Sequence, residues 1–257
     1  MRARSWGLLS PLAARRLVVA TDLDGTFLGG SADERAALYG WLRSNRATVG
    51  LIFVTGRAFD SVAPLLEDPA LPVPEVVIAD VGASVGSGFP LEPIAELESR
   101  LLGSWPGREA VKQMFNDLAL EEQSVPQRGR VSFKVTDPAL VQACRARAAS
   151  HGFNLVYSRS RYLDVLPAGV DKGRSLLAVL DHFGVAPERV LACGDTLNDL
   201  SLLETGLCAV AVGGSEPALL EATRSFANVL HARRLGAAGI TEAISHFFEP
   251  LTGGARS

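Results

Sequence analysis

The sequence predicts an α/β fold in which helices cover both faces of a parallel sheet and an α+β domain is inserted. From residue 16 onward, short apolar runs alternate with helix-like segments. These runs are apolar throughout, which is typical of strands that are buried on both faces. The alternation stops after residue 85, where a segment rich in Gly and Pro begins. We therefore expect a core formed by residues 1–85 and 166–257, with an inserted domain over residues 86–165.

The first part of the core is predicted to contain three strands and two helices. The apolar runs at 17–20, 49–54 and 75–79 are the strands, and the segments 32–45 and 59–66 have the pattern of helices. Ahead of them, residues 1–16 carry several arginines around a short Leu/Ala segment. Without a clear apolar region or cleavage site, this segment is expected to be a frayed tail over residues 1–15 rather than a targeting peptide.

The insertion mixes both kinds of element. Helices are predicted at 94–102, 108–118 and 138–151, and strands at 131–135 and 154–157. The core then resumes with a helix at 172–183, a strand at 189–193, a helix at 197–203 and a strand at 208–212. Two helices, at 217–224 and 237–248, complete the predicted series.

Composition excludes several classes of protein. The 257 residues are 47% hydrophobic and 21% charged, an ordinary globular balance. A net charge of −3 gives no basic face for nucleic acid and no polybasic anchor for a membrane. No apolar run approaches the roughly 20 residues that span a bilayer. Three widely spaced cysteines without a CxxC pattern favour a reducing cytoplasm over a disulfide framework. The sequence leaves the oligomeric state open.

Polar clusters follow four of the predicted strands directly. They are Thr21-Asp22-Leu23-Asp24-Gly25-Thr26, Thr55-Gly56-Arg57, Asp80-Val81-Gly82-Ala83-Ser84 and Gly194-Asp195-Thr196-Leu197-Asn198-Asp199. In an open parallel sheet, ligands bind beyond the carboxyl ends of the strands. We therefore expect these four clusters to meet at one edge of the sheet.

The acidic residues in these clusters predict a metal site. Asp22, Asp24, Asp195 and Asp199 would lie close together, and carboxylates that share a cleft must bind a proton or a cation. Mg²⁺ prefers one or two carboxylates, water and a substrate phosphate. The phosphate could be held by the groups around the acids, namely Lys172, Arg57 and the hydroxyls of Thr26 and Thr55. A carboxylate nucleophile beside a metal and a lysine makes a workable phosphoryl-transfer site.

These segments resemble the four motifs of the haloacid dehalogenase superfamily: Asp22-Leu23-Asp24-Gly25-Thr26, Thr55 in Val54-Thr55-Gly56-Arg57, Lys172 in Asp171-Lys172-Gly173, and Gly194–Asp199. The resemblance implies a Rossmann-like core. The insertion lies between the second and third motifs, where the type-2 (C2B) cap of this superfamily sits. Together with Arg130-Val131-Ser132-Phe133 and Leu163-Asp164-Val165-Leu166-Pro167, it resembles the subgroup of sucrose-phosphate phosphatases and related sugar phosphatases.

The resemblance implies a Mg²⁺-dependent phosphatase that acts on a small phosphorylated sugar. Asp22 would be the nucleophile that forms an aspartyl-phosphate, and Asp24 the general acid and then base. Thr55 and Lys172 would bind the phosphoryl oxygens. Mg²⁺ would be held by Asp22, the backbone carbonyl of Asp24, Asp195 and, directly or through water, Asp199.

Substrate contacts are expected from both parts of the chain. In the core, the candidates are Thr26, Gly56, Arg57 and Asn198. In the cap, which would close over the site and set the choice of sugar, they are Arg130, Ser132, Lys134, Ser158 and Arg159.

Other functions remain compatible with parts of the sequence. A sugar phosphomutase of the same superfamily would use the same aspartyl-phosphate, and a sugar-phosphate-binding protein could use the fold without catalysis. Gly82-Ala83-Ser84-Val85-Gly86 also matches the G-x-S-x-G elbow of α/β-hydrolases. That elbow must open a helix, and the following Ser-Gly-Phe-Pro favours a loop instead.

Overall fold

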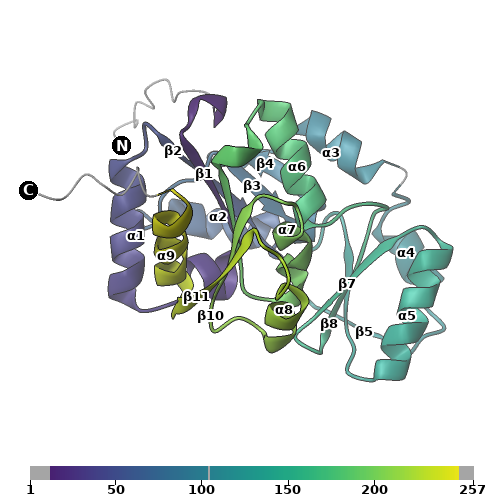
Figure 1. Ribbon diagram of the computed structural model, residues 1–257. Helices are drawn as coiled ribbons and strands as arrows, with labels where there is room; N and C mark the ends of the chain where they lie inside the picture. Colours follow the sequence, from purple (N-terminus) through teal and green to yellow (C-terminus); the bar gives the residue numbers. More distant parts are fainter. Residues whose placement is uncertain (1–11, 104, 249–257) are drawn as a thin grey trace, which may run out of the picture.

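The computed structural model describes residues 12–103 and 105–248, and its core is a seven-stranded sheet with the order β11-β10-β9-β1-β2-β3-β4 (Figure 1). Every neighbouring pair is parallel except β3 and β4, which are antiparallel. The strands are β1 (Leu17–Thr21), β2 (Val49–Val54), β3 (Val76–Ala79), β4 (Ser84–Ser87), β9 (Val190–Gly194), β10 (Cys208–Gly213) and β11 (Val229–Leu235). The predicted α/β class is confirmed.

Helices cover both faces of this sheet. One face packs against α1 (Ala32–Ser44), α2 (Phe59–Glu67) and α9 (Gly236–Phe247). The other packs against α3 (Ala95–Leu102), α6 (Lys172–Phe183), α7 (Leu200–Leu203) and α8 (Pro217–Ala222). Successive side chains of β1 alternate between the two layers, with Leu17 and Val19 in the first and Val18 and Ala20 in the second. Strands buried on both faces explain the continuous apolar runs of the sequence.

Local signals set the ends of the core helices. The hydroxyl of Ser31 accepts a hydrogen bond from the backbone N–H of Glu34, whose carboxylate accepts in return from the Ser31 N–H, and this capping box starts α1. Asp171 caps α6 by accepting from the N–H of Arg174. At the other end of α6, Gly184 takes a left-handed conformation with φ 65°, which suits glycine.

The inserted domain has its own sheet and its own apolar cluster. Its four strands are antiparallel in the order β5-β6-β8-β7, with bounds β5 (Glu121–Glu122), β6 (Val131–Lys134), β7 (Asn154–Ser158) and β8 (Tyr162–Leu166). Two helices, α4 (Arg108–Met114) and α5 (Pro138–Ser150), pack on it around Phe115, Val131, Phe133 and Cys144. This domain lies beside the carboxyl ends of the core strands, at the lower right of Figure 1. We refer to it below as the cap.

The cap begins later in the chain than the predicted residue 86. Strand β4 pairs with β3 at the edge of the core sheet. Helix α3 also belongs to the core, because Leu97 packs with the apolar side chains of α6. The Gly/Pro-rich segment that suggested a boundary is the turn between these two core elements. The second sheet and its helices occupy residues 108–166.

Besides the edge strand β4, the strands β5, β8 and β11 were not expected from the sequence. Strand β5 has only two residues, both acidic. Strand β8 is mostly apolar but follows β7 after a short turn. Strand β11 is largely exposed and carries His231, Arg233 and Arg234, so it has no apolar run to reveal it. Pairing with a neighbouring strand, rather than burial, defines β5 and β11, whereas β8 is buried inside the cap sheet.

The prediction of a frayed tail over residues 1–15 is partly incorrect. Residues 1–11 lie outside the described part of the chain. Leu12 is buried, and the guanidinium of Arg15 is buried beside Glu75, at 3.1 Å from its carboxylate. These residues therefore belong to the packed core. Among the described residues, no helix combines the length and apolar character needed to cross a bilayer. The three cysteines are unpaired.

Candidate active site

The first motif forms a tight turn at the end of β1. The backbone N–H of Asp22 donates to the carbonyl of Cys193, which joins the ends of β1 and β9. Gly25 has φ 91°, and a Cβ there would lie 2.3 Å from Oδ2 of Asp195. Next to it, the hydroxyl of Thr26 donates to Oδ1 of Asp195 at 2.9 Å. Glycine at position 25 therefore lets the first motif approach the fourth.

Lys172 lies at the centre of the site and is completely buried. Its Nζ donates to Oδ1 of Asp22 at 2.7 Å, to Oδ1 of Asp199 at 2.6 Å and to Oδ1 of Asn198 at 2.9 Å. Burial by itself would lower the pKa of this lysine, but the carboxylates of Asp199 and Asp22 raise it above its ordinary value. The ammonium is therefore permanently charged, and its three donors are all used.

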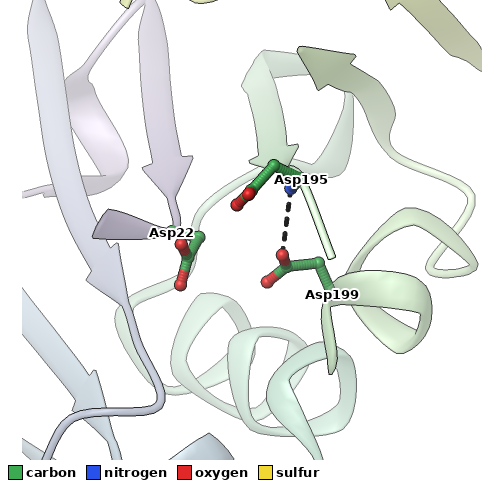
Figure 2. Close-up of side chains that lie close together, drawn as sticks. All are labelled: Asp22, Asp195 and Asp199. Atoms are coloured by element: carbon green, nitrogen blue, oxygen red, sulfur yellow. Dashed lines mark hydrogen bonds between the residues drawn. The ribbon is translucent and has the colours of Figure 1, made fainter. Parts of the chain in front are cut away.

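Three buried carboxylates converge around this lysine. Atoms of Asp22, Asp195 and Asp199 lie within 4.8 Å of one another, and Figure 2 shows the three side chains facing a common space. Burial raises the pKa of Asp22, against the lowering effect of Lys172, and the neighbouring acids raise it further. Burial and the Asp199 carboxylate likewise raise the pKa of Asp195 to about 6. One lysine does not neutralise three acids, so the donor set fits a divalent cation.

The three acids differ in the oxygen atoms that they leave free. Both oxygens of Asp199 are engaged, Oδ1 by Lys172 and Oδ2 by the backbone N–H groups of Asp195 and Thr196 at 3.0 Å. Among the described residues, Oδ2 of Asp22 accepts no hydrogen bond. Within residues 12–103 and 105–248, the sole charged partner of Oδ2 of Asp195 is Arg159, at 3.6 Å. Asp22 and Asp195 are therefore suited to direct ligation, whereas Asp199 orients Lys172 and the loop of the fourth motif.

The second acid of the first motif has a different environment. Asp24 is half exposed, and both its oxygens accept from Arg57, at 2.8 Å from Nε and 2.5 Å from Nη2. The hydrogen bond from Arg57 holds the pKa of Asp24 below its usual value. Thr55 is buried at the end of β2, where its hydroxyl accepts from the N–H of Arg57. Arg57 of the second motif thus contacts Asp24 of the first motif.

A cavity of about 440 Å³ opens above these residues, between the core and the cap. From the core it is lined by residues of the first, second and fourth motifs: Asp22, Asp24, Gly56, Arg57, Thr196 and Asn198. From the cap it is lined mainly by polar side chains: Gln123, Arg130, Ser158, Arg159, Tyr162 and Asp164, with Val125 and Pro126. The volume falls in the range of pockets for small ligands, roughly 300–1,000 Å³.

The predicted cap residues divide into two groups. Arg130, Ser158 and Arg159 line the cavity. Ser132 lies behind it and donates to Asp164, and Lys134 pairs with Glu121 in the adjacent strand. The structure places these last two outside the cavity lining.

Sequence reasoning missed Gln123, Tyr162 and Asp164. Asp164 could have been noticed, because it is a single carboxylate within the apolar run 163–166. The other two lie among ordinary polar residues and give no signal of their own.

The G-x-S-x-G segment does not form a nucleophile elbow. Ser84 begins strand β4 rather than a helix, and its hydroxyl donates to Oδ2 of Asp80 at 2.9 Å. No histidine is among its hydrogen-bond partners in the described part of the chain. Ser84 therefore lies in a strand, whereas the sequence predicted a loop, and the absence of a helix after it disfavours a serine hydrolase.

Known proteins match the chain over nearly its whole length. Residues 15–248 match the family model described as sucrose-6F-phosphate phosphohydrolase. The chain is 46% identical over 236 residues to the glucosylglycerol-phosphate synthase of Pseudomonas anguilliseptica, a match that covers 90% of this chain and 31% of that protein. It is 29% identical over 254 residues to sucrose-phosphatase 1 of Nicotiana tabacum, covering 91% and 60% respectively. The chain thus spans less than two thirds of either relative.

A solved structure matches in both chain length and fold. The sucrose-phosphatase of Synechocystis sp. PCC6803, determined in complex with sucrose and phosphate, superposes with a TM-score of 0.81 at 26% identity. The match covers 91% of this chain and 98% of that one. Core and cap together, rather than the core alone, are therefore shared with it.

Proposed function

The chain belongs to the sucrose-6F-phosphate phosphohydrolase family, and from this premise we propose that it hydrolyses the phosphate ester of a small glycosyl compound. One observation carries the proposal. A buried carboxylate, Asp22, contacts a buried lysine and lines a cavity that the cap closes from above. Nucleophile, cation and ligand space therefore meet at one point.

Asp22 is the proposed nucleophile. Its Oδ1 is fixed by Lys172, which leaves Oδ2 to attack the phosphorus in line and form an aspartyl-phosphate. The ammonium of Lys172 offsets negative charge that would otherwise repel the incoming phosphate. Thr55, at the end of the adjacent strand, offers its hydroxyl to a phosphoryl oxygen. Asn198 and the backbone of Gly56 line the same part of the cavity.

Asp24 is the proposed acid and base. It would protonate the leaving oxygen of the sugar and then deprotonate the water that hydrolyses the aspartyl-phosphate, because the second half-reaction requires the reverse proton transfer. Its carboxylate lines the cavity but is held by Arg57. Arg57 therefore orients Asp24, and substrate must loosen this pair before Asp24 can donate a proton.

Mg²⁺ is the proposed cofactor. Asp195 would hold it with Oδ2, and Asp22 with Oδ1, the oxygen that Lys172 also contacts, so that Oδ2 of Asp22 stays free for attack; the backbone carbonyl of Asp24 would complete the set of protein ligands. When bound, the ion would neutralise charge on the phosphoryl group as it is transferred. Asp199 would act indirectly, by holding Lys172 and the N–H groups that shape the metal-binding loop.

Several glycosyl phosphates are candidate substrates. The family description names a sucrose phosphate, and the 46% identity to part of a glucosylglycerol-phosphate synthase makes glucosylglycerol phosphate an equally direct choice. A phosphatase would consume the product of such a synthase. The polar side chains of the cap wall suit the hydroxyl groups that these compounds share.

The test is phosphate release from sucrose 6-phosphate, glucosylglycerol phosphate and monosaccharide phosphates in the presence of Mg²⁺. Asp22→Asn keeps the shape of the side chain and should lower kcat at least about 1,000-fold. Asp33→Asn, an exposed acid in the first turn of α1, is the matched control and should behave as wild type. Equal turnover by wild type and Asp22→Asn would rule out this nucleophile. Transfer of phosphate to a second sugar hydroxyl would identify a phosphomutase instead.

A further inference from the structure

The loop after β3 has a strained backbone next to the cap. Asp80 and Val81 both adopt positive φ, 52° and 57°, which is unusual for any residue except glycine and especially for a β-branched one. Such strain persists only where the surrounding structure requires it, and it concentrates at functional sites. Neither residue belongs to the four motifs, so the proposed chemistry does not explain this conformation.

The strained turn directs the carboxylate of Asp80 at the cap. Asp80 is fully buried, with Oδ2 accepting from the hydroxyl of Ser84 and Oδ1 accepting from Nε of Arg130 at 3.2 Å. The backbones are also close here, since a Cβ on Gly129 would lie 2.7 Å from that of Ala83. A buried ion pair therefore connects core and cap at the point where they touch.

Arg130 carries the connection onward into the cap. Its Nη1 donates to Oδ1 of Asp164 at 2.7 Å, and the hydroxyl of Ser132 donates to the same oxygen. Arg130 and Asp164 are both more than 90% buried. Each end of the guanidinium is thus held by a carboxylate, Asp80 from the core and Asp164 from the cap, and its planar shape fixes the orientation of both.

Asp164 lines the cavity with one oxygen still available. Among the described residues, its Oδ2 accepts no hydrogen bond. The cap wall also contains Gln123, Ser158 and Tyr162, which are neutral, and Arg130 and Arg159, which are cationic. A fixed carboxylate oxygen in such a polar wall is a suitable acceptor for sugar hydroxyl groups.

We propose that Asp164 is a specificity-determining residue that accepts hydrogen bonds from hydroxyl groups of the leaving sugar or polyol, and that Asp80 and Arg130 are the positioning residues that orient it. This inference rests on the proposed phosphatase function. Because Asp80 belongs to the core and Asp164 to the cap, the hydroxyl-binding wall is complete only while the cap lies on the core. The wall can therefore recognise the leaving group only when the cap is closed on the core.

The experiment compares two leaving groups. Steady-state kcat and KM are measured for sucrose 6-phosphate and glucosylglycerol phosphate, which present many hydroxyl groups, and for phenyl phosphate, which presents none. The variants are Asp164→Asn, Arg130→Lys and Asp80→Asn. The control is Asp117→Asn, which alters an exposed cap ion pair with Arg147 outside the cavity. Thermal unfolding checks that each variant is folded. If Asp80→Asn does not fold, the inference is judged on Asp164→Asn and Arg130→Lys.

Each of the three variants should raise KM for the better glycosyl substrate about 10- to 100-fold while changing KM for phenyl phosphate less than about 3-fold. The double variant Asp80→Asn with Asp164→Asn should lose little more than Asp164→Asn alone, because Asp80 acts on the leaving group only through Arg130 and Asp164. Asp117→Asn should change neither substrate.

Equal losses with both kinds of leaving group would overturn the inference, since a merely structural ion pair would not distinguish them. Unchanged KM in all three variants would overturn it as well. A wild-type protein that releases phosphate from no ester at all would instead overturn the proposed function, and this inference with it.

Discussion

The core site and the cap wall both contain buried charges, but the two regions assemble them differently. In the core, Lys172 is bonded to three side chains of the core itself, and none of these contacts depends on the cap. In the cap, Arg130 divides its guanidinium between a core carboxylate and a cap carboxylate. The groups proposed to react are therefore assembled within the core alone, whereas the groups proposed to face the leaving group require two domains in contact.

The largest expected difference between the regions is at their two lysines. Lys172→Met leaves buried carboxylates without their cation, which should destabilise the protein by about 3–5 kcal/mol and reduce kcat at least about 1,000-fold. Lys134→Met removes a half-exposed pair with Glu121 on the cap and should cost at most about 1 kcal/mol. Urea unfolding of both variants measures this contrast. Similar losses at the two positions would mean that Lys172 is not the centre of a charge cluster.

A smaller difference is expected at two glycines with positive φ. Gly25 and Gly152 have φ 91° and 72°, but only Gly25 has atoms within 4 Å of where a Cβ would lie. Gly152→Ala should cost about 1–2 kcal/mol through backbone strain alone. Gly25→Ala should cost about 2–4 kcal/mol, because its Cβ must also displace Asp195. Mg²⁺ titration calorimetry should show weakened binding for Gly25→Ala only, and unchanged binding would place Asp195 outside the metal site.

The smallest predicted effect is the pH dependence of the core site. The pKa of Asp195 is raised to about 6 in the folded protein, from an ordinary value near 4. In EDTA, the contribution of this group to the free energy of unfolding is therefore full below about pH 4 and is lost as the pH rises through 6, by roughly 2–3 kcal/mol. Bound Mg²⁺ should remove this loss, since it stabilises the ionised carboxylate.

Mg²⁺ affinity provides the complementary measurement. It should fall about tenfold for each pH unit below 6, as protons compete for Asp195. Asp195→Asn is the control for both experiments, because an amide does not titrate. A stability profile that is the same with and without Mg²⁺ would contradict a metal site at these carboxylates.

The sequence by itself determined the core. Apolar runs marked β1, β2, β3, β9 and β10, since a strand buried on both faces has to be continuously apolar. Because polar motifs follow these strands at once, the parallel arrangement brings Asp22, Asp195 and Asp199 together, and Lys172 joins them from the start of α6. Each signal is local, which is why the expected cluster and its elements could be read from residue order.

The tertiary structure decided what the cap contributes. Asp80, Arg130 and Asp164 are far apart in sequence, and although Arg130 was a candidate and Asp164 interrupts an apolar run, no local signal shows that the three side chains meet. Gln123 follows the two-residue strand β5 and Tyr162 begins β8, and both line the cavity through the packing of the cap sheet. The edge strands β4 and β11 likewise depend on pairing with neighbours. A cavity wall built between two domains is fixed by contacts across the chain, and a polar side chain that will face a ligand has the same local pattern as one that will face water.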